Sequence, residues 1–135
     1  MNYRLTCAVA AIVLAVVAIP ASAHHAVQAV FDYNRPVKVT GSVTKVEFIN
    51  PHSYIALDVK GASGPVQHWT FELPGPGSLK KAGMSRADRG GLKPGDEITI
   101  SGFRAKDNSN FGFLNTLKFP DGRSFVIDTR DPNGN

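Results

Sequence analysis

Cysteine is nearly absent from this chain. Cys7 is the one cysteine among 135 residues, and it falls in a leader segment that we expect to be removed. A mature chain without cysteine excludes disulfide bonds, thiolate metal sites and cysteine nucleophiles. Cys7 also precedes the apolar run of the leader, whereas a lipidated cysteine follows such a run. The sequence therefore does not indicate a lipoprotein.

A dense block of basic residues is also missing. The formal net charge is +4, from 15 Lys and Arg against 11 Asp and Glu, and the basic residues are spread along the chain. Loss of Arg4 with the leader would leave 14 against 11, a net charge of +3. Arms that bind nucleic acid concentrate Lys and Arg in short runs. We therefore expect no nucleic acid partner.

The familiar catalytic motifs are missing as well. No serine lies in a nucleophile-elbow motif, and the glycines of residues 75–77 lack the lysine and helix pattern of a phosphate-binding loop. Asp32, Glu47, Asp58 and Glu72 are scattered and suggest no pair of catalytic carboxylates. We therefore predict a binding protein without catalytic residues, not an enzyme.

What the chain does have is a leader of secretory type at residues 1–23. Arg4 supplies its positive charge, residues 8–19 are apolar, and Ala21 and Ala23 form the small-x-small motif of a cleavage site. About a dozen apolar residues are fewer than the ~20 of a membrane-spanning helix, so a retained anchor is the less favoured alternative. We predict cleavage after Ala23, a periplasmic or secreted product, and no membrane span after removal of the signal.

The mature chain predicts a single domain with short extensions. Residues 24–36 form a lead-in that ends in a turn at the Asn-Arg-Pro of residues 34–36. Residues 37–128 form the domain, and the polar residues 129–135 are expected to be a disordered tail. A mature length of 112 residues suits one domain with a core of ordinary size.

Alternating apolar residues predict an all-β domain. The first strand is long, and Gly41 and a change of alternation near Thr44 indicate a β-bulge within it. A short helix capped by Ser78 separates the third and fourth strands. This order matches a small five-stranded OB-like barrel, with an open β-sandwich as the alternative. The strands are expected at residues 37–49, 54–59, 66–73, 97–103 and 111–119, with a terminal hairpin reaching residues 125–127.

Cleavage after Ala23 would make His24 the first residue of the mature protein. Its α-amine has an ordinary pKa near ~8, so the lone pair becomes available to a metal near neutral pH. The amine and the imidazole of one residue form a chelate ring. Nitrogen-rich planar sites favour Cu(II), which also heads the divalent affinity order. Copper is therefore the predicted metal, and zinc is the alternative.

A third nitrogen would complete such a site. His52 is our first choice, because it follows Asn50 and Pro51 in a rigid turn. His25 is the second choice and His68 the third. The alternative interpretation is that the first two histidines are solvated and that the turn histidine bonds the backbone.

The second hypothesis is a ligand face without metal. OB barrels bind ligands across their second and third strands, where Tyr54, His68 and Lys60 are expected to project, with Arg104 and Lys106 nearby. The partner would be a peptide, a glycan or a protein of the cell envelope. Trp69 and Phe71 alternate with polar residues and are predicted to lie in the core.

Several motifs run along most of the mature chain. They are Ala23-His24-His25, Phe31-Asp32, Arg35-Pro36-Val37, residues 41–48, Asn50-Pro51-His52, residues 69–73 and residues 92–96. On these motifs the chain resembles a family of small exported bacterial proteins of unknown function, with the His-His start and the Asn-Pro-His turn as the specific part. The resemblance implies a periplasmic OB-like domain and no particular activity. Ala26, where the family often has Ser, and the expanded residues 86–91 depart from the family pattern.

Overall fold

The computed structural model describes residues 23–61, 64–84 and 91–127, and for residues 23–26 the backbone alone. The predicted leader up to residue 22, the predicted tail and residues 86–90 of the expanded segment 86–91 therefore lie outside the described residues. No helix in the described ranges is long and apolar enough to cross a bilayer.

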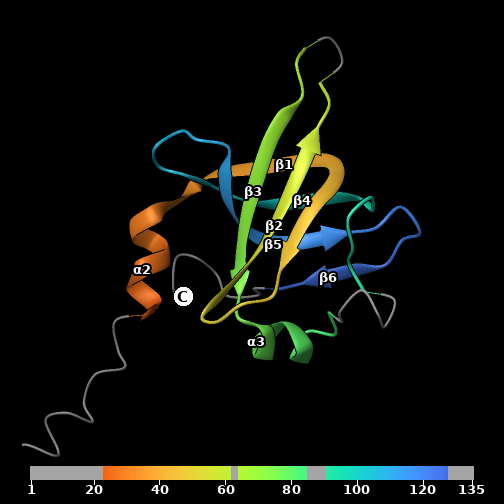
Figure 1. Ribbon diagram of the computed structural model, residues 1–135. Coiled ribbons are helices and arrows are strands. Elements are labelled where there is room, and N and C mark those ends of the chain that lie inside the picture. The colour runs from red at the N-terminus through yellow and green to blue at the C-terminus, as the bar shows by residue number, and fades with distance from the viewer. Residues whose placement is uncertain (1–22, 62–63, 85–90, 128–135) are drawn as a thin grey trace, which may run out of the picture. The chain divides into compact units, whose positions relative to one another are not determined.

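The described chain is mostly β, as the sequence predicts (Figure 1). Its sheet has six strands in the order β3-β2-β1-β4-β5-β6, and an added parallel pairing of β3 with β5 closes β1 to β5 into a ring. All other strand pairs are antiparallel. The elements are α2 (Ala23–Val30), β1 (Phe31–Glu47), β2 (His52–Val59), β3 (Gln67–Pro74), α3 (Pro76–Lys81), β4 (Glu97–Ala105), β5 (Phe111–Lys118) and β6 (Ser124–Val126).

The lead-in differs from the prediction. It forms the helix α2 up to Val30, the chain divides into two units there, and β1 begins at Phe31. The turn predicted at residues 34–36 is wrong, because β1 runs through it with a register irregularity between Phe31 and Pro36. Proline has no N–H to donate, and an irregular stretch of a strand tolerates that loss.

The predicted bulge in β1 is confirmed. The pairing of β1 with β2 shifts register between Val43 and Lys45, so Thr44 is the extra residue. Gly41 marks a close approach of the two strands, since a Cβ atom there would lie 2.5 Å from the carbonyl oxygen of Asp58. A side chain at this position would push β1 away from β2.

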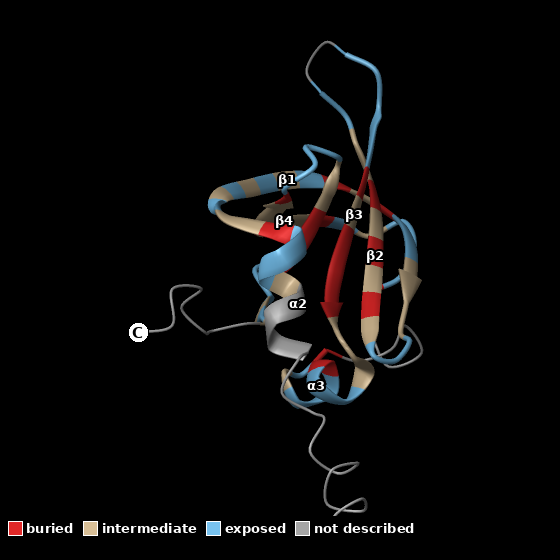
Figure 2. Cartoon of the chain, turned by 90° about the vertical axis from the view of Figure 1, so that its left-hand side faces the viewer, coloured by how far each residue is buried: buried red, intermediate tan, exposed pale blue. Residues whose placement is uncertain are grey.

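The core fills the inside of the ring. Ile55 and Leu57 of β2 are buried and alternate with half-exposed residues, which confirms the predicted pattern (Figure 2). Trp69 and Phe71 of β3 are 5% and 0% exposed, and their rings stack 5.8 Å apart. The prediction that both aromatics belong to the core is confirmed. The buried polar residues of the described part are Ser53 and Glu72, and the Ser53 hydroxyl finds no hydrogen-bond partner there.

The short helix predicted between the third and fourth strands is confirmed as α3. It begins at Pro76, not at a capping Ser78, and its N-terminal flank Gly75 provides no side-chain cap. Proline suits the first helical turn because that turn leaves its N–H groups unpaired. Leu79 is the buried residue of α3, and Gly83 follows the helix with a φ of 86°. A positive φ favours glycine, as expected for a helix end.

Candidate functional site

The candidate site lies on the outer face of β1, β2 and β3, the face opposite the core. On β2 this face carries His52, Tyr54, Ala56 and Asp58, because alternate side chains of a strand point to opposite sides. Cross-strand pairing places Tyr54 between Glu47 of β1 and Glu72 of β3. On β3, His68 lies opposite Asp58, and Pro74 lies opposite His52.

His52 contacts the carboxylate of Glu72 across the two strands. Its Nδ1 lies 2.7 Å from Oε1 of Glu72, and the side chains are 38% and 12% exposed. An ionised carboxylate can only accept a hydrogen bond, so Nδ1 of a neutral imidazole must carry the proton. Nε2 then keeps its lone pair, and no partner for it occurs within the described ranges.

The pKa values of Glu72 and Tyr54, the two residues beside His52, are both raised. Burial raises the pKa of Glu72, and the nearby His52 offsets part of that rise. Burial also raises the pKa of Tyr54, and the carboxylates of Glu72 and Glu47 raise it further. Tyr54 is therefore a neutral phenol at physiological pH, which can donate or accept a hydrogen bond but is no anionic ligand.

The backbone before His52 is closely packed. The Asn50–Pro51 peptide bond is cis. A Cβ atom at Gly75, which follows β3, would lie 2.6 Å from the carbonyl oxygen of Pro51. The turn and the end of β3 thus touch through backbone atoms, which holds the start of β2, and with it His52, in one place.

A second histidine and carboxylate pair lies at the other end of the same face. Nδ1 of His68 is 2.6 Å from Oδ1 of Asp58, and the side chains are 80% and 36% exposed. Asp58 follows His52 by six positions on β2, which corresponds to about 20 Å of extended strand. One metal ion cannot bind both His52 and His68 over that distance.

The other sequence-predicted residues are distributed as follows. The backbone of His24 and His25 lies in α2, and their side chains are outside the described part. Tyr54 neighbours His52, whereas the exposed Lys60 follows β2 at the end of the face that carries Asp58. The described residues contain no group of three or more His, Cys, Asp or Glu that could hold a metal ion.

Comparison with known proteins places the chain in a family. The family model described as a family of unknown function, DUF6152, matches residues 11–115. The chain belongs to the DUF6152 family. No curated protein matches the sequence. The expectation of an uncharacterised family is confirmed, and the family description names no activity.

The sequence did not reveal that two carboxylates of this DUF6152 protein are partners of histidines. Glu72 and Asp58 look scattered along the chain, yet each binds the Nδ1 of a histidine on the neighbouring strand. The signal that could reveal them is the β2–β3 register. Once Ile55 is aligned with Phe71, Tyr54 falls opposite Glu72, and His52 lies one outward position away on the same face.

Arg104 has a structural role that the ligand-face hypothesis did not include. Its guanidinium lies 5.2 Å from the ring centroid of Trp69. It also donates hydrogen bonds to the carbonyl oxygens of Asn108 at 2.7 Å and Ser109 at 2.9 Å. These contacts tie the loop between β4 and β5 to β3, so Arg104 is engaged within the DUF6152 domain.

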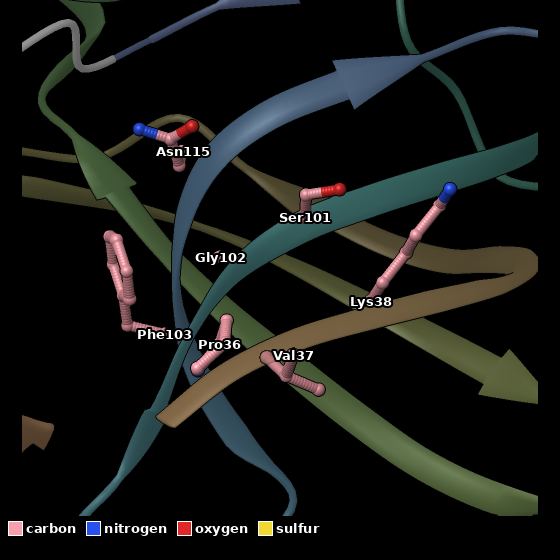
Figure 3. Close-up of a pocket in the computed structure, with 7 residues that line it drawn as sticks. All are labelled: Pro36, Val37, Lys38, Ser101, Gly102, Phe103 and Asn115. Carbon is pink, nitrogen blue, oxygen red and sulfur yellow. The ribbon is translucent and has the colours of Figure 1, made fainter. Parts of the chain in front are cut away.

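A mainly apolar hollow of about 410 Å³ opens on β1, β4 and β5 (Figure 3). Phe103, which lines it, packs edge-on against Tyr33, with ring centroids 4.7 Å apart. Of its lining residues, Lys38 is the one that carries a charge. The hollow thus lacks the paired ionisable groups of the outer face. Its lining is Pro36, Val37, Lys38, Ser101, Gly102, Phe103 and Asn115.

Proposed function

We propose that this protein is an exported OB-like binding protein that holds one Cu(II) ion through His24 and His52, with His25 assisting. His24 would contribute its α-amine and its imidazole after cleavage behind Ala23. Zinc is the alternative metal, because imidazole nitrogens also suit it. The protein performs no reaction in this proposal.

The strand order supports the OB-like part of the proposal. An OB fold is a five-stranded, partly open barrel built on a long first strand. Here the ring of β1 to β5, the bulged 17-residue β1 and the placement of α3 between β3 and β4 agree with that arrangement.

The contact between His52 Nδ1 and the Glu72 carboxylate is the observation that carries the metal proposal. Histidines that bind metals commonly donate their second ring N–H to a carboxylate, which selects the tautomer, orients the ring and raises its basicity. Glu72 makes this contact at 2.7 Å, while the imidazole remains part-exposed. His52 is therefore a histidine prepared to offer Nε2 to a metal.

The chemistry of the predicted mature N-terminus supplies the other ligands. An α-amine loses its proton near pH ~8, far below a lysine ammonium. Together with the His24 ring it forms a chelate, and His52 adds a third nitrogen. Cu(II) favours such planar nitrogen sets over the other first-row divalent ions.

The test compares two forms of the chain that differ only before His24. One form begins at His24, and the other begins at Pro20, so that the His24 nitrogen is an amide. We expect Cu(II) to bind the extended form at least tenfold more weakly, which corresponds to about 1.4 kcal/mol. Competition with a chromophoric copper chelator measures the two affinities.

The choice of Pro20 as the start is important. An extension of one or two residues would make a histidine the third residue, where a new amine and the intervening amides could form an unrelated copper chelate. Equal affinity of the two forms would show that the amine is no ligand. That result would favour the alternative function, in which the Tyr54 face binds a peptide or envelope partner without metal.

A further inference from the structure

A polar pocket lies where β1 runs between β2 and β4. Its volume is about 530 Å³, within the range of small-molecule sites. It lies beside the pair of Asp58 and His68, at the end of the sheet away from His52. We call it the β1 pocket. Its lining is Thr40, Gly41, Ser42, Thr44, Asp58, Lys60 and Glu97.

Strand pairing gathers opposite kinds of hydrogen-bonding groups in the β1 pocket. Ser42 of β1 pairs with Asp58 of β2 on one side and with Glu97 of β4 on the other. Residues directly opposite in antiparallel strands have Cβ atoms about 5 Å apart. A hydroxyl therefore stands between two carboxylates, and Thr40 and the bulge residue Thr44 add two further hydroxyls to the lining.

Much of the hydrogen-bonding capacity of the pocket is unused. Within the described part of the chain, the side chains of Ser42, Lys60 and Glu97 have no hydrogen-bond or ion-pair partner. Asp58 is different, because Nδ1 of His68 lies 2.6 Å from its Oδ1, while its second oxygen has no partner among the described residues. The pocket thus combines one fixed acceptor with a free acceptor and a free ammonium donor.

The composition of the lining restricts what can bind. Two carboxylates outnumber the one ammonium group, so an anionic ligand would meet net repulsion. A metal ion would need several ligating side chains close together, and the described residues contain no group of three or more His, Cys, Asp or Glu that could hold one. The seven lining residues include no aromatic or large apolar side chain against which a flat apolar ligand could pack. A neutral ligand with several hydroxyls fits, because each hydroxyl both donates and accepts.

We propose that the β1 pocket binds a neutral sugar ring, whose hydroxyls donate to Asp58 and Glu97 and accept from Lys60. This site is separate from the proposed copper site, since Asp58 and His52 are about 20 Å apart along β2. Sugar binding therefore needs neither a metal nor a free His24 amine.

The experiment titrates ¹⁵N-labelled protein with sugars in the presence of EDTA and follows the amide resonances. The neutral probes are glucose, galactose, mannose and N-acetylglucosamine, and galacturonate serves as the acidic counterpart of galactose. We expect at least one neutral sugar to shift the amides of Ser42, Asp58, Lys60 and Glu97 saturably. Galacturonate should bind at least tenfold more weakly than the neutral sugar that binds best, because its carboxylate faces two others.

Two variants locate the binding. Glu97→Gln should weaken the binding of the neutral sugar at least tenfold, since the exposed Glu97 loses a charged acceptor. Glu47→Gln is the matched control, because Glu47 lies on β1 outside the pocket. The Glu47→Gln variant should bind the neutral sugar as tightly as the parent protein does. The proposal is overturned if none of the four neutral sugars saturates, if galacturonate binds as well as the best neutral sugar, or if Glu97→Gln binds that sugar like the parent protein.

Discussion

Replacing Gly102 with alanine should destabilise the domain by about 3 kcal/mol, the cost expected when an extra carbon is forced against fixed atoms. Gly102 lies on β4, at a register shift between β4 and β5. A Cβ atom there would overlap the carbonyl oxygen of Phe113 and lie 3.0 Å from its carbon. Because those atoms are backbone of the neighbouring strand, no side-chain rotation relieves the overlap. Thermal unfolding should show a Tm lowered by roughly 10–20 °C.

Gly77→Ala is the matched control for this prediction. Gly77 lies in the first turn of α3, and a Cβ atom there meets nothing within 4 Å. Alanine is the better helix former, so this variant should be as stable as the parent or more stable by about 0.5 kcal/mol. Equal stability of Gly102→Ala and the parent protein would show that β4 and β5 do not approach each other as closely as described.

His52→Gln should weaken Cu(II) binding by about 100-fold in the chain that begins at His24. Losing a carboxylate that orients a metal-bound histidine costs 10–100-fold in affinity, and loss of the ligand itself costs at least as much. The glutamine amide can still donate a hydrogen bond to Glu72, so the buried carboxylate keeps a partner. Isothermal titration under chelator competition measures the change.

His68→Gln controls for the general effect of removing an imidazole. His68 also binds a carboxylate through Nδ1, but its pair with Asp58 lies about 20 Å from His52 along the strand. Its copper affinity should therefore match that of the parent chain. A loss of the same size in both variants would mean that copper binds the imidazoles one by one at the surface, without a defined site.

Local patterns made much of the fold predictable. The alternation at Ile55 and Leu57 depends on the two-residue period of a strand, and the changed alternation near Thr44 follows from one extra residue in β1. Both features depend on neighbouring residues in the chain, which is why the sequence alone was sufficient to predict them. The prediction of a turn at residues 34–36 was wrong because of a contact between distant parts of the chain. Pairing with β4 continues β1 through Pro36.

The candidate site was only partly predictable. His52 was chosen because it follows a rigid turn, but its contact with Glu72 depends on a pairing between residues 20 positions apart in the chain. The β1 pocket was even less predictable, since Asp58 and Glu97 come from two different strands and both pair with Ser42. Residue types and spacing do not reveal such neighbours until the register of the strands is known.

The most direct test of the copper proposal is the mass and metal content of protein recovered from cells that produce the full chain with its own leader. The proposal predicts a chain that begins at His24 and carries about one copper per molecule. A chain that begins elsewhere, or one that begins at His24 and carries neither copper nor zinc after growth with both metals, would contradict it.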